Sequence, residues 1–343
     1  FYNDFRDALR LIFSRHSWDF PSDPADALGK MDPTQYVAYL VADGNGMGRL
    51  FDRQPDRESL QSLSDRLTKA LWASLAAPAP DLIQRLEELG FAADDCPVIP
   101  LIVGGDDLFA LLPARYALDT ARRVCTIFEK AMGEHATLSA AVVICQSHYP
   151  YTLAHEYGEQ MLSQAKKLAK SLGGVSTISF DVIVGNELPL ALAEGQAYRP
   201  TLKPYFTGSY MKGHELAGID LFALLDARRA LKTLPGKRKA ELRVLFDPYR
   251  MKELEEQQKR LLWEKRLDTL RSRLPDDIRE SLDRVLAALG GAGFKSASDI
   301  WRILKRPNEI AEPHAHGLLD LIDAWDYAYQ LDLPDMVYEA EEI

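Results

Sequence analysis

The sequence predicts an α+β domain followed by an all-α domain, and three observations support this prediction. Apolar runs of strand length recur through the first half of the chain, separated by amphipathic stretches of helical length. From about residue 212 onward the strand pattern disappears, and Leu recurs at helical spacing among Lys, Arg and Glu. Pro200 and Pro204 mark the junction between the two parts. The predicted regions are an N-terminal helical segment (1–30), the α+β domain (31–211) and a C-terminal helical domain (212–343).

The elements of the α+β domain follow the order βαββαβ, continued by one more helix and one more strand. The predicted strands span 36–43, 97–104, 107–113, 138–146 and 176–184. The predicted helices span 56–76, 80–89, 115–132 and 150–172. The second and third strands form a hairpin, and we expect the helices to cover one face of the sheet.

Helical patterns also lie outside this domain. The predicted helices are Phe1–Arg15, Lys237–Leu274, Arg279–Leu289 and Leu318–Leu331. The basic cluster Lys237-Arg238-Lys239 is most simply a solvated helix start, with an RNA backbone contact as the alternative.

The turn between the second and third strands reads Gly104-Gly105-Asp106-Asp107. Glycine permits a tight turn that residues with a Cβ resist. Two adjacent carboxylates at such a tip repel each other unless cations share them. Carboxylate oxygens suit Mg²⁺ or Mn²⁺, and two such ions about 3.5–4 Å apart are the usual catalysts of nucleotidyl transfer. The simpler alternative is a hairpin turn in which Gly and Asp have no further role.

Asp43 ends the first predicted strand and is followed by the glycine-rich stretch 44–48. An acid at a strand end, followed by such a turn, places a metal ligand beside backbone N–H groups that can hold phosphate oxygens. We therefore expect Asp43, Asp106 and Asp107 to meet at one end of the sheet as catalytic residues and metal ligands.

Four segments in this order resemble one family. Ala42–Phe51 (ADGNGMGRLF) and Gly104–Pro113 (GGDDLFALLP) resemble the palm domain of the large subunit of type III CRISPR effector complexes, and more distantly the GGDEF diguanylate cyclases. Leu138–Ile144 resembles the fourth strand of that palm, and the helix Pro150–Leu172 follows it. Thr201–Tyr205 resembles the "RPY" stretch found shortly after the CRISPR palm. Together these motifs cover residues 36–210.

The resemblance implies a ferredoxin-like palm fold and a nucleotidyltransferase that makes a cyclic di- or oligonucleotide second messenger from ATP in antiviral defence. It implies that Asp43, Asp106 and Asp107 bind two Mg²⁺ or Mn²⁺ ions. In the family a lysine of the helix after the fourth strand contacts the triphosphate, for which we choose Lys166 over Lys167. The remaining nucleotide-binding residues expected are Gly44, Asn45, Gly46, Met47, Gly48, Gly104 and Gly105. The implied partners are a nucleoside triphosphate and either subunits of an RNA-guided CRISPR complex or a second copy of the chain.

The chain also departs from the family pattern. Asp107 stands where diguanylate cyclases carry Glu, which favours the CRISPR-like branch. No His-Asp dipeptide occurs, so we expect no HD nuclease in this chain. Cys96, Cys125 and Cys145 are too few and too widely spaced for the four-cysteine zinc site that many of these large subunits carry. The chain begins at Phe1 rather than Met, as a piece of a longer protein would.

Composition restricts the class of protein. A formal net charge of −10 argues against broad, non-specific nucleic-acid binding, although a local basic groove stays compatible with it. No apolar run approaches the roughly 20 residues of a membrane span. Three cysteines, an odd number, argue against a disulfide framework. We therefore expect a soluble cytoplasmic enzyme without a membrane partner.

Several alternatives stay open at this level. The protein could be a GTP-using enzyme like the diguanylate cyclases, a non-catalytic nucleotide-binding module, or a scaffold subunit of an RNA-guided CRISPR complex. Arg49 either reaches a phosphate or lies at the surface. Lys203 and Tyr205 either face the nucleotide or pack the domain junction.

Overall fold

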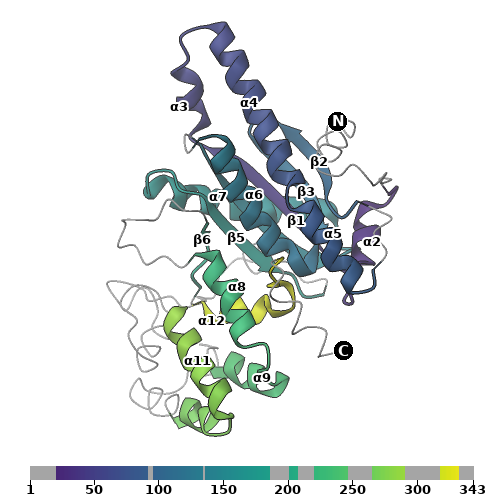
Figure 1. The fold of residues 1–343 in the computed structure, drawn as a ribbon, viewed down its shortest axis with the longest axis vertical. Coiled ribbons are helices and arrows are strands. Elements are labelled where there is room, and N and C mark those ends of the chain that lie inside the picture. Colours follow the sequence, from purple (N-terminus) through teal and green to yellow (C-terminus); the bar gives the residue numbers. More distant parts are fainter. Residues whose placement is uncertain are drawn as a thin grey trace. The chain divides into compact units, whose positions relative to one another are not determined.

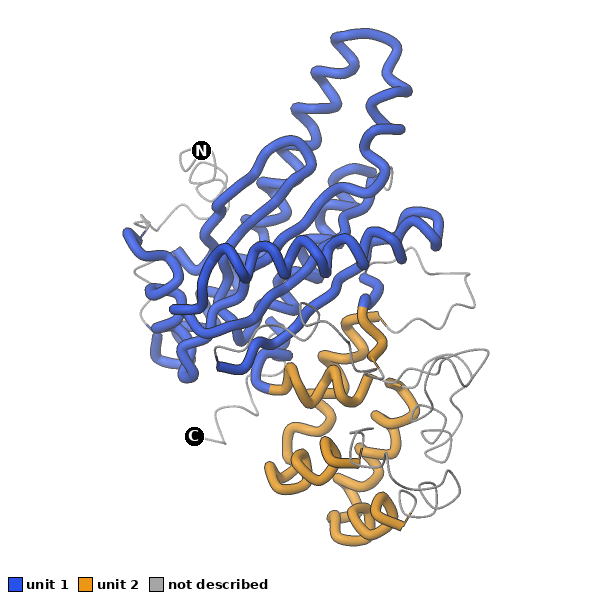
Figure 2. The backbone as a smooth tube through the Cα atoms, turned by 180° about the vertical axis from the view of Figure 1, so that it is seen from behind, with its two compact units in different colours: residues 1–193, 204–213, 326–343 blue, residues 194–203, 214–325 orange. Residues whose placement is uncertain are grey.

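The computed structural model describes residues 21–91, 96–133, 136–185, 201–207, 220–245, 265–289 and 317–331. The chain divides into two compact units, coloured separately in Figure 2. Unit 1 comprises residues 1–193, 204–213 and 326–343, and unit 2 comprises 194–203 and 214–325. Residues 326–343, which we assigned to the helical domain, thus group with unit 1. The predicted helix Phe1–Arg15 lies outside the described residues.

Unit 1 is built around a six-stranded sheet in the order β2-β3-β1-β4-β5-β6 (Figure 1). The strands are β1 (Tyr36–Asn45), β2 (Ile99–Gly104), β3 (Asp107–Pro113), β4 (Thr137–Gln146), β5 (Thr177–Val182) and β6 (Tyr205–Phe206). The central strand β1 is antiparallel to β3 and β4, whereas β5 is parallel to β4. The five predicted strands are confirmed to within two residues at each end, and the short β6 was not predicted.

The helices of unit 1 also follow the predicted order. They are α2 (Pro24–Gly29), α3 (Met47–Asp52), α4 (Arg57–Ala76), α5 (Ala79–Glu88), α6 (Ala117–Ala131) and α7 (Tyr151–Ser171). The four long predicted helices correspond to α4 to α7, and the short α2 and α3 were not predicted. Asp56 caps α4, because its side chain accepts a hydrogen bond from the N–H of Ser59 (2.8 Å). None of the described helices is long and apolar enough to span a membrane.

The helices cover both faces of the sheet, so the prediction that they cover one face is wrong. Neighbouring residues of an extended chain point to opposite faces. The Thr177 hydroxyl donates to the carbonyl of Ala165 in α7 (2.9 Å), whereas the Ser176 hydroxyl donates to the carboxylate of Glu129 in α6 (3.1 Å). Figure 1 accordingly shows α4 and α6 in front of the sheet. The physical reason is burial, because β4 is buried at every position except its last and therefore needs cover on both faces.

Gly158 allows α7 to lie close to β1. A Cβ at this position would lie 2.7 Å from Cγ2 of Val41 and 3.5 Å from Cγ2 of Val143. Gly158→Ala is therefore expected to lower the free energy of unfolding by about 1–3 kcal/mol, the usual cost of overpacking a buried contact. Denaturant titration would measure this loss, with Ser163→Ala at an exposed position of the same helix as control. Equal stability of the two variants would contradict the packing argument.

Residues 326–331 form a C-terminal strap that packs within unit 1. The ring of Tyr327 lies 5.4 Å from that of Tyr36, and the Arg115 guanidinium lies 3.7 Å above the ring of Tyr329. The N–H of Leu331 donates to the carboxylate of Asp119 (2.9 Å). The strap replaces the second half of the predicted helix 318–331, which ends at Asp323 and is followed by a 3₁₀ turn (Trp325–Tyr327).

Among its described residues, unit 2 is helical. Its helices are α8 (Leu221–Ala230), α9 (Gly236–Leu245), α11 (Asp276–Ala288) and α12 (Leu318–Asp323). The predicted helix 279–289 corresponds to α11. The predicted helix 237–274 corresponds to α9 and to a helical stretch over 265–271, and residues 246–264 between them lie outside the described part.

Candidate active site

The turn between β2 and β3 has the tight geometry that its glycines permit. β2 ends at Gly104 and β3 begins at Asp107, and these two residues pair across the hairpin. Gly105 has a φ of +63°, in the left-handed region that favours glycine. Asp106 and Asp107 therefore stand at the tip of the hairpin.

The central strand brings Asp43 to the same end of the sheet. Asp43 pairs in register with Asp107, and the N–H of Gly44 donates to the carbonyl of Asp106 (3.3 Å). A Cβ at Gly44 would lie 2.6 Å from Cγ of Met47 and 3.0 Å from Cβ of Asp106. Only glycine thus lets the hairpin tip approach β1 this closely, and three carboxylates from two distant segments gather as a result.

The three carboxylates disturb one another electrostatically. Burial raises the pKa of Asp106, and the negative charge of Asp43 raises it further. Burial and the charge of Asp43 also raise the pKa of Asp107, whereas Lys166 lowers it. Oδ1 of Asp43 is buried and has no hydrogen-bond partner. The site therefore combines closely spaced carboxylates with a buried carboxylate oxygen that accepts no hydrogen bond.

Lys166 provides the cation that the structure places in this cluster. Its Nζ lies 2.6 Å from Oδ2 of Asp43, and the side chains of Lys166 and Asp43 are 37% and 23% exposed. The resemblance implied a contact between Lys166 and a triphosphate, and the sequence did not predict the ion pair with Asp43.

The three carboxylates are chemically suited to bind a divalent cation, although their oxygens do not converge on one point. Within the part of the chain that the structure describes, no three His, Cys, Asp or Glu side chains lie close enough to hold a metal ion. The unpartnered Oδ1 of Asp43 and the raised pKa values of Asp106 and Asp107 are nevertheless the features that a cation would relieve. Hard carboxylate oxygens suit Mg²⁺ or Mn²⁺, so the two-metal site stays a prediction.

The glycine-rich stretch after Asp43 differs from the expected open turn. β1 continues to Asn45, and the N–H of Gly44 is already used in the bond to Asp106. Gly46 takes a left-handed conformation (φ +69°), and α3 begins directly at Met47, whose side chain is buried. The first N–H groups of a helix have no partner within it. In this stretch, the backbone N–H groups of residues 46–48 are therefore the ones that could bind a phosphate.

Arg49 lies over the same turn. An ideal Cβ at Gly46 would lie 3.3 Å from Nη2 of Arg49, so the guanidinium stands directly above Gly46. Arg49 is exposed, so both readings, a phosphate contact and a surface role, stay open.

A buried polar network that the sequence did not reveal lies beneath the site. The side-chain amide of Asn45 donates to Oγ1 of Thr137 (3.0 Å) and to the carbonyl of Val175 (3.2 Å). Ser139 donates to Oδ1 of Asn45 (2.8 Å) and lies 3.0 Å from the hydroxyl of Thr177. The Asn45 side chain is thus engaged within the protein and its backbone pairs in register with Thr137, so the nucleotide contact expected of Asn45 stays a prediction. The alternation of Ser and Thr with apolar residues in β4 and β5 is the signal that could have indicated this network.

Residues of the stretch 201–205 make packing contacts, Tyr205 within unit 1 and Thr201 and Lys203 within unit 2. Tyr205 is buried in β6, where its ring stacks on that of Phe180 at 5.7 Å. Lys203 is 14% exposed with its Nζ 3.9 Å from the buried carboxylate of Asp320, which also accepts from Thr201 (2.7 Å). Of the two readings kept open for Lys203 and Tyr205, packing is the one these contacts support.

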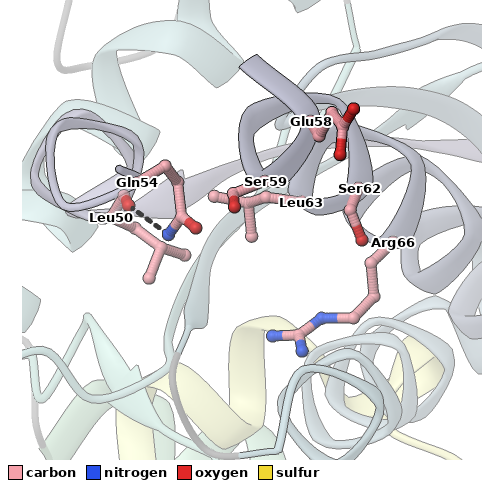
Figure 3. Close-up of a pocket in the computed structure, with 7 residues that line it drawn as sticks. All are labelled: Leu50, Gln54, Glu58, Ser59, Ser62, Leu63 and Arg66. Carbon is pink, nitrogen blue, oxygen red and sulfur yellow. Dashed lines mark hydrogen bonds between the residues drawn. The ribbon is translucent and has the colours of Figure 1, made fainter. Parts of the chain in front are cut away.

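A groove of about 530 Å³ opens between α3 and α4 (Figure 3). Its lining residues are Leu50, Gln54, Glu58, Ser59, Ser62, Leu63 and Arg66. Leu50 lies one helical turn after Gly46, as its N–H donates to the Gly46 carbonyl (3.3 Å). Figure 3 shows the Gln54 amide turned back to the Leu50 carbonyl (3.0 Å). The groove therefore begins within one turn of the glycine-rich stretch.

Comparison with known proteins finds one matching family and several similar structures. Residues 36–172 match the family Cas10/Cmr2, second palm domain. No curated protein matches the chain. The crystal structure of Csm1 in T. onnurineus shares 14% sequence identity at a TM-score of 0.53, over 91% of this chain and 40% of that chain. A Csm1–Csm4 cassette in complex with pppApApA shares 13% identity at a TM-score of 0.48, over 91% and 40% of the two chains.

The matches cover only part of the compared chains. At 14% identity, the similarity to Csm1 establishes a shared fold alone. This chain spans about two fifths of the length of the two chains compared. The family match covers both acidic motifs, the hairpin between β2 and β3, and α7 with Lys166. The resemblance inferred from the sequence is confirmed over residues 36–172, which match the second palm domain of Cas10/Cmr2.

Proposed function

We propose that the protein is a palm-type nucleotidyltransferase that joins ATP molecules into a cyclic di- or oligonucleotide, a second messenger of CRISPR antiviral defence. One observation carries the proposal: Asp43, Asp106 and Asp107 gather at one end of the sheet of a Cas10/Cmr2-type palm, with more negative charge than the protein itself neutralises. Carboxyls such as Asp106 and Asp107, whose pKa values are raised by burial and by a neighbouring carboxylate, are typical of functional sites.

In this proposal the three aspartates hold Mg²⁺ or Mn²⁺. When bound, the metal would lower the pKa of the attacking ribose hydroxyl and stabilise the charge on the departing pyrophosphate. The backbone N–H groups at the start of α3 and the Arg49 guanidinium above Gly46 would bind phosphate oxygens. Lys166 would add a positive charge near the β- and γ-phosphates.

The groove between α3 and α4 is the proposed place of the nucleoside. A nucleotide whose phosphates rest at the turn around Gly46 would extend along α3, where Leu50 and Leu63 offer apolar surface. Gln54, Ser59 and Ser62 offer polar groups that can meet the edge of a base. The preference for adenine follows the family resemblance, and a GTP-using enzyme is the alternative at this site.

The deciding experiment supplies each nucleotide in turn. The purified chain would be incubated with ATP, GTP, CTP or UTP and Mg²⁺ or Mn²⁺, and mass spectrometry would identify the products. A cyclic oligoadenylate would support the proposal, and a cyclic product made only from GTP would favour the diguanylate-cyclase-like alternative. Calorimetric nucleotide binding with no product under any condition, including added target RNA, would favour a binding or scaffold role. The proposed partners in such a role are subunits of an RNA-guided complex.

Ligand binding is expected to stabilise the folded protein. ATP together with Mg²⁺ or Mn²⁺ should raise the melting temperature, because a ligand that binds only the folded state stabilises it by about 2.7 kcal/mol at 100 times its Kd. Differential scanning fluorimetry would measure the shift, with ATP plus EDTA as control. An unchanged melting temperature with every nucleotide would count against the site.

A further inference from the structure

The ion pair between Lys166 and Asp43 occupies one of the two carboxylate oxygens that a metal could use. Nζ of Lys166 lies 2.6 Å from Oδ2 of Asp43, while Oδ1 of the same carboxylate is buried and unpartnered. Asp43 is also the group whose charge raises the pKa values of both Asp106 and Asp107. The lysine thus neutralises the central member of the acidic cluster.

The fold itself holds Lys166 in this place. The residue before it, Ala165, is buried, and its carbonyl accepts a hydrogen bond from Oγ1 of Thr177 (2.9 Å). Thr177 lies 3.0 Å from Ser139, which pairs in register with Asp43 across β1 and β4. A chain of contacts therefore runs from the strand that carries Asp43 to the turn of α7 that carries Lys166.

We propose that Lys166 is a built-in counter-ion of the acidic cluster, which competes with the divalent cation for Asp43 and becomes free for a triphosphate only when the metal displaces it. A divalent cation on the Asp43 carboxylate and the ammonium group of Lys166 would repel each other. Metal entry would therefore release the ammonium group at the moment when phosphate oxygens become its best partners. This inference rests on the proposed metal role of Asp43, and it assigns an order, metal first and triphosphate contact second.

The test measures Mn²⁺ binding to the full chain without nucleotide. Lys166→Met removes the competing charge, so the variant is expected to bind Mn²⁺ about fivefold more tightly than the unmodified chain, the effect of an ion pair worth about 1 kcal/mol. Electron paramagnetic resonance of free Mn²⁺ or calorimetry would give the affinity. Lys167→Met is the matched control, because Lys167 is an exposed neighbour on the same helix. The control should bind Mn²⁺ as the unmodified chain does.

A second variant protects the test against loss of the fold. Lys166→Arg keeps the charge and should keep the Mn²⁺ affinity of the unmodified chain, whereas Lys166→Gln should behave like Lys166→Met. Unchanged or weaker Mn²⁺ binding in both neutral variants would overturn the proposal, as would an equal gain in Lys167→Met. This test does not measure turnover. If the variants show the expected ranking of Mn²⁺ affinities but the chain forms no product, only the proposed catalysis is refuted.

Discussion

Replacing Asp106 and Asp107 together by Asn is expected to abolish product formation while raising the melting temperature of the metal-free protein. Loss of both carboxylates removes two metal ligands at once, which should lower the rate by at least about 10³-fold. The folded protein should become more stable, because burial and the charge of Asp43 raise the pKa of both carboxyls. At neutral pH these ionised groups destabilise the fold, and neutral Asn removes this cost. Neither side chain belongs to the core, so the fold has no need of them.

The pH dependence separates this explanation from a general gain in stability. A carboxyl whose pKa is raised in the folded state favours folding when protonated, and this contribution is lost as the pH rises through the folded-state pKa. The advantage of the double Asn variant should therefore be largest at neutral pH and should vanish toward pH of about 4, near the unfolded pKa of Asp. Thermal unfolding of both proteins across this range would show it. A double variant less stable than the unmodified chain at pH 7 would instead indicate a structural role.

Asp119→Ala is expected to cause a large loss of stability in unit 1. The Asp119 carboxylate is completely buried and accepts hydrogen bonds from Nε of Arg122 (2.8 Å), Nε of Arg123 (3.1 Å) and the N–H of Leu331 (2.9 Å). Its removal takes one acceptor from each of two guanidinium groups and from the backbone N–H of Leu331. Because both arginines are less than one fifth exposed, we expect a loss of about 3 kcal/mol.

Asp81 provides the matched control for this measurement. Its carboxylate lies 2.6 Å from Nη1 of the same Arg123, but the side chain is 50% exposed. Exposed ion pairs contribute about 0.2–1 kcal/mol, so Asp81→Ala should be nearly neutral. Denaturant titration of both variants would reveal the difference, and similar losses would show that burial does not decide the effect.

The sequence predicted the sheet well because local patterns carry most of the required information. Runs such as 107–113 have strand length and lie between turn residues, so their existence and order follow from the chain alone. The gathering of Asp43 with Asp106 and Asp107 followed from the expectation that their strands end at the same edge. The register Asp43↔Asp107 agrees with that expectation.

What the sequence did not predict depends on contacts between distant segments. β3, β4 and β5 run in the same direction and lie in this order across the sheet, with β1 between β3 and β4, yet α6 and α7 connect them over opposite faces. The two crossovers therefore have opposite hands, against the usual preference for one hand. The pairing of Lys166 with Asp43 and of Asp119 with Leu331 likewise depends on tertiary packing, because each pair is more than one hundred residues apart.

The C-terminal strap has a topological consequence. The chain enters unit 2 twice, over 194–203 and over 214–325, and the longer of these segments begins after residues 204–213 of unit 1 and ends where unit 1 resumes at Asp326. Closing a long loop removes conformations from the unfolded segment, at a cost that grows only slowly with its length. A single proteolytic cut within unit 2 would therefore leave two fragments still joined through Asp119 and the rings of Tyr36 and Tyr329. The palm would keep its strap after such a cut.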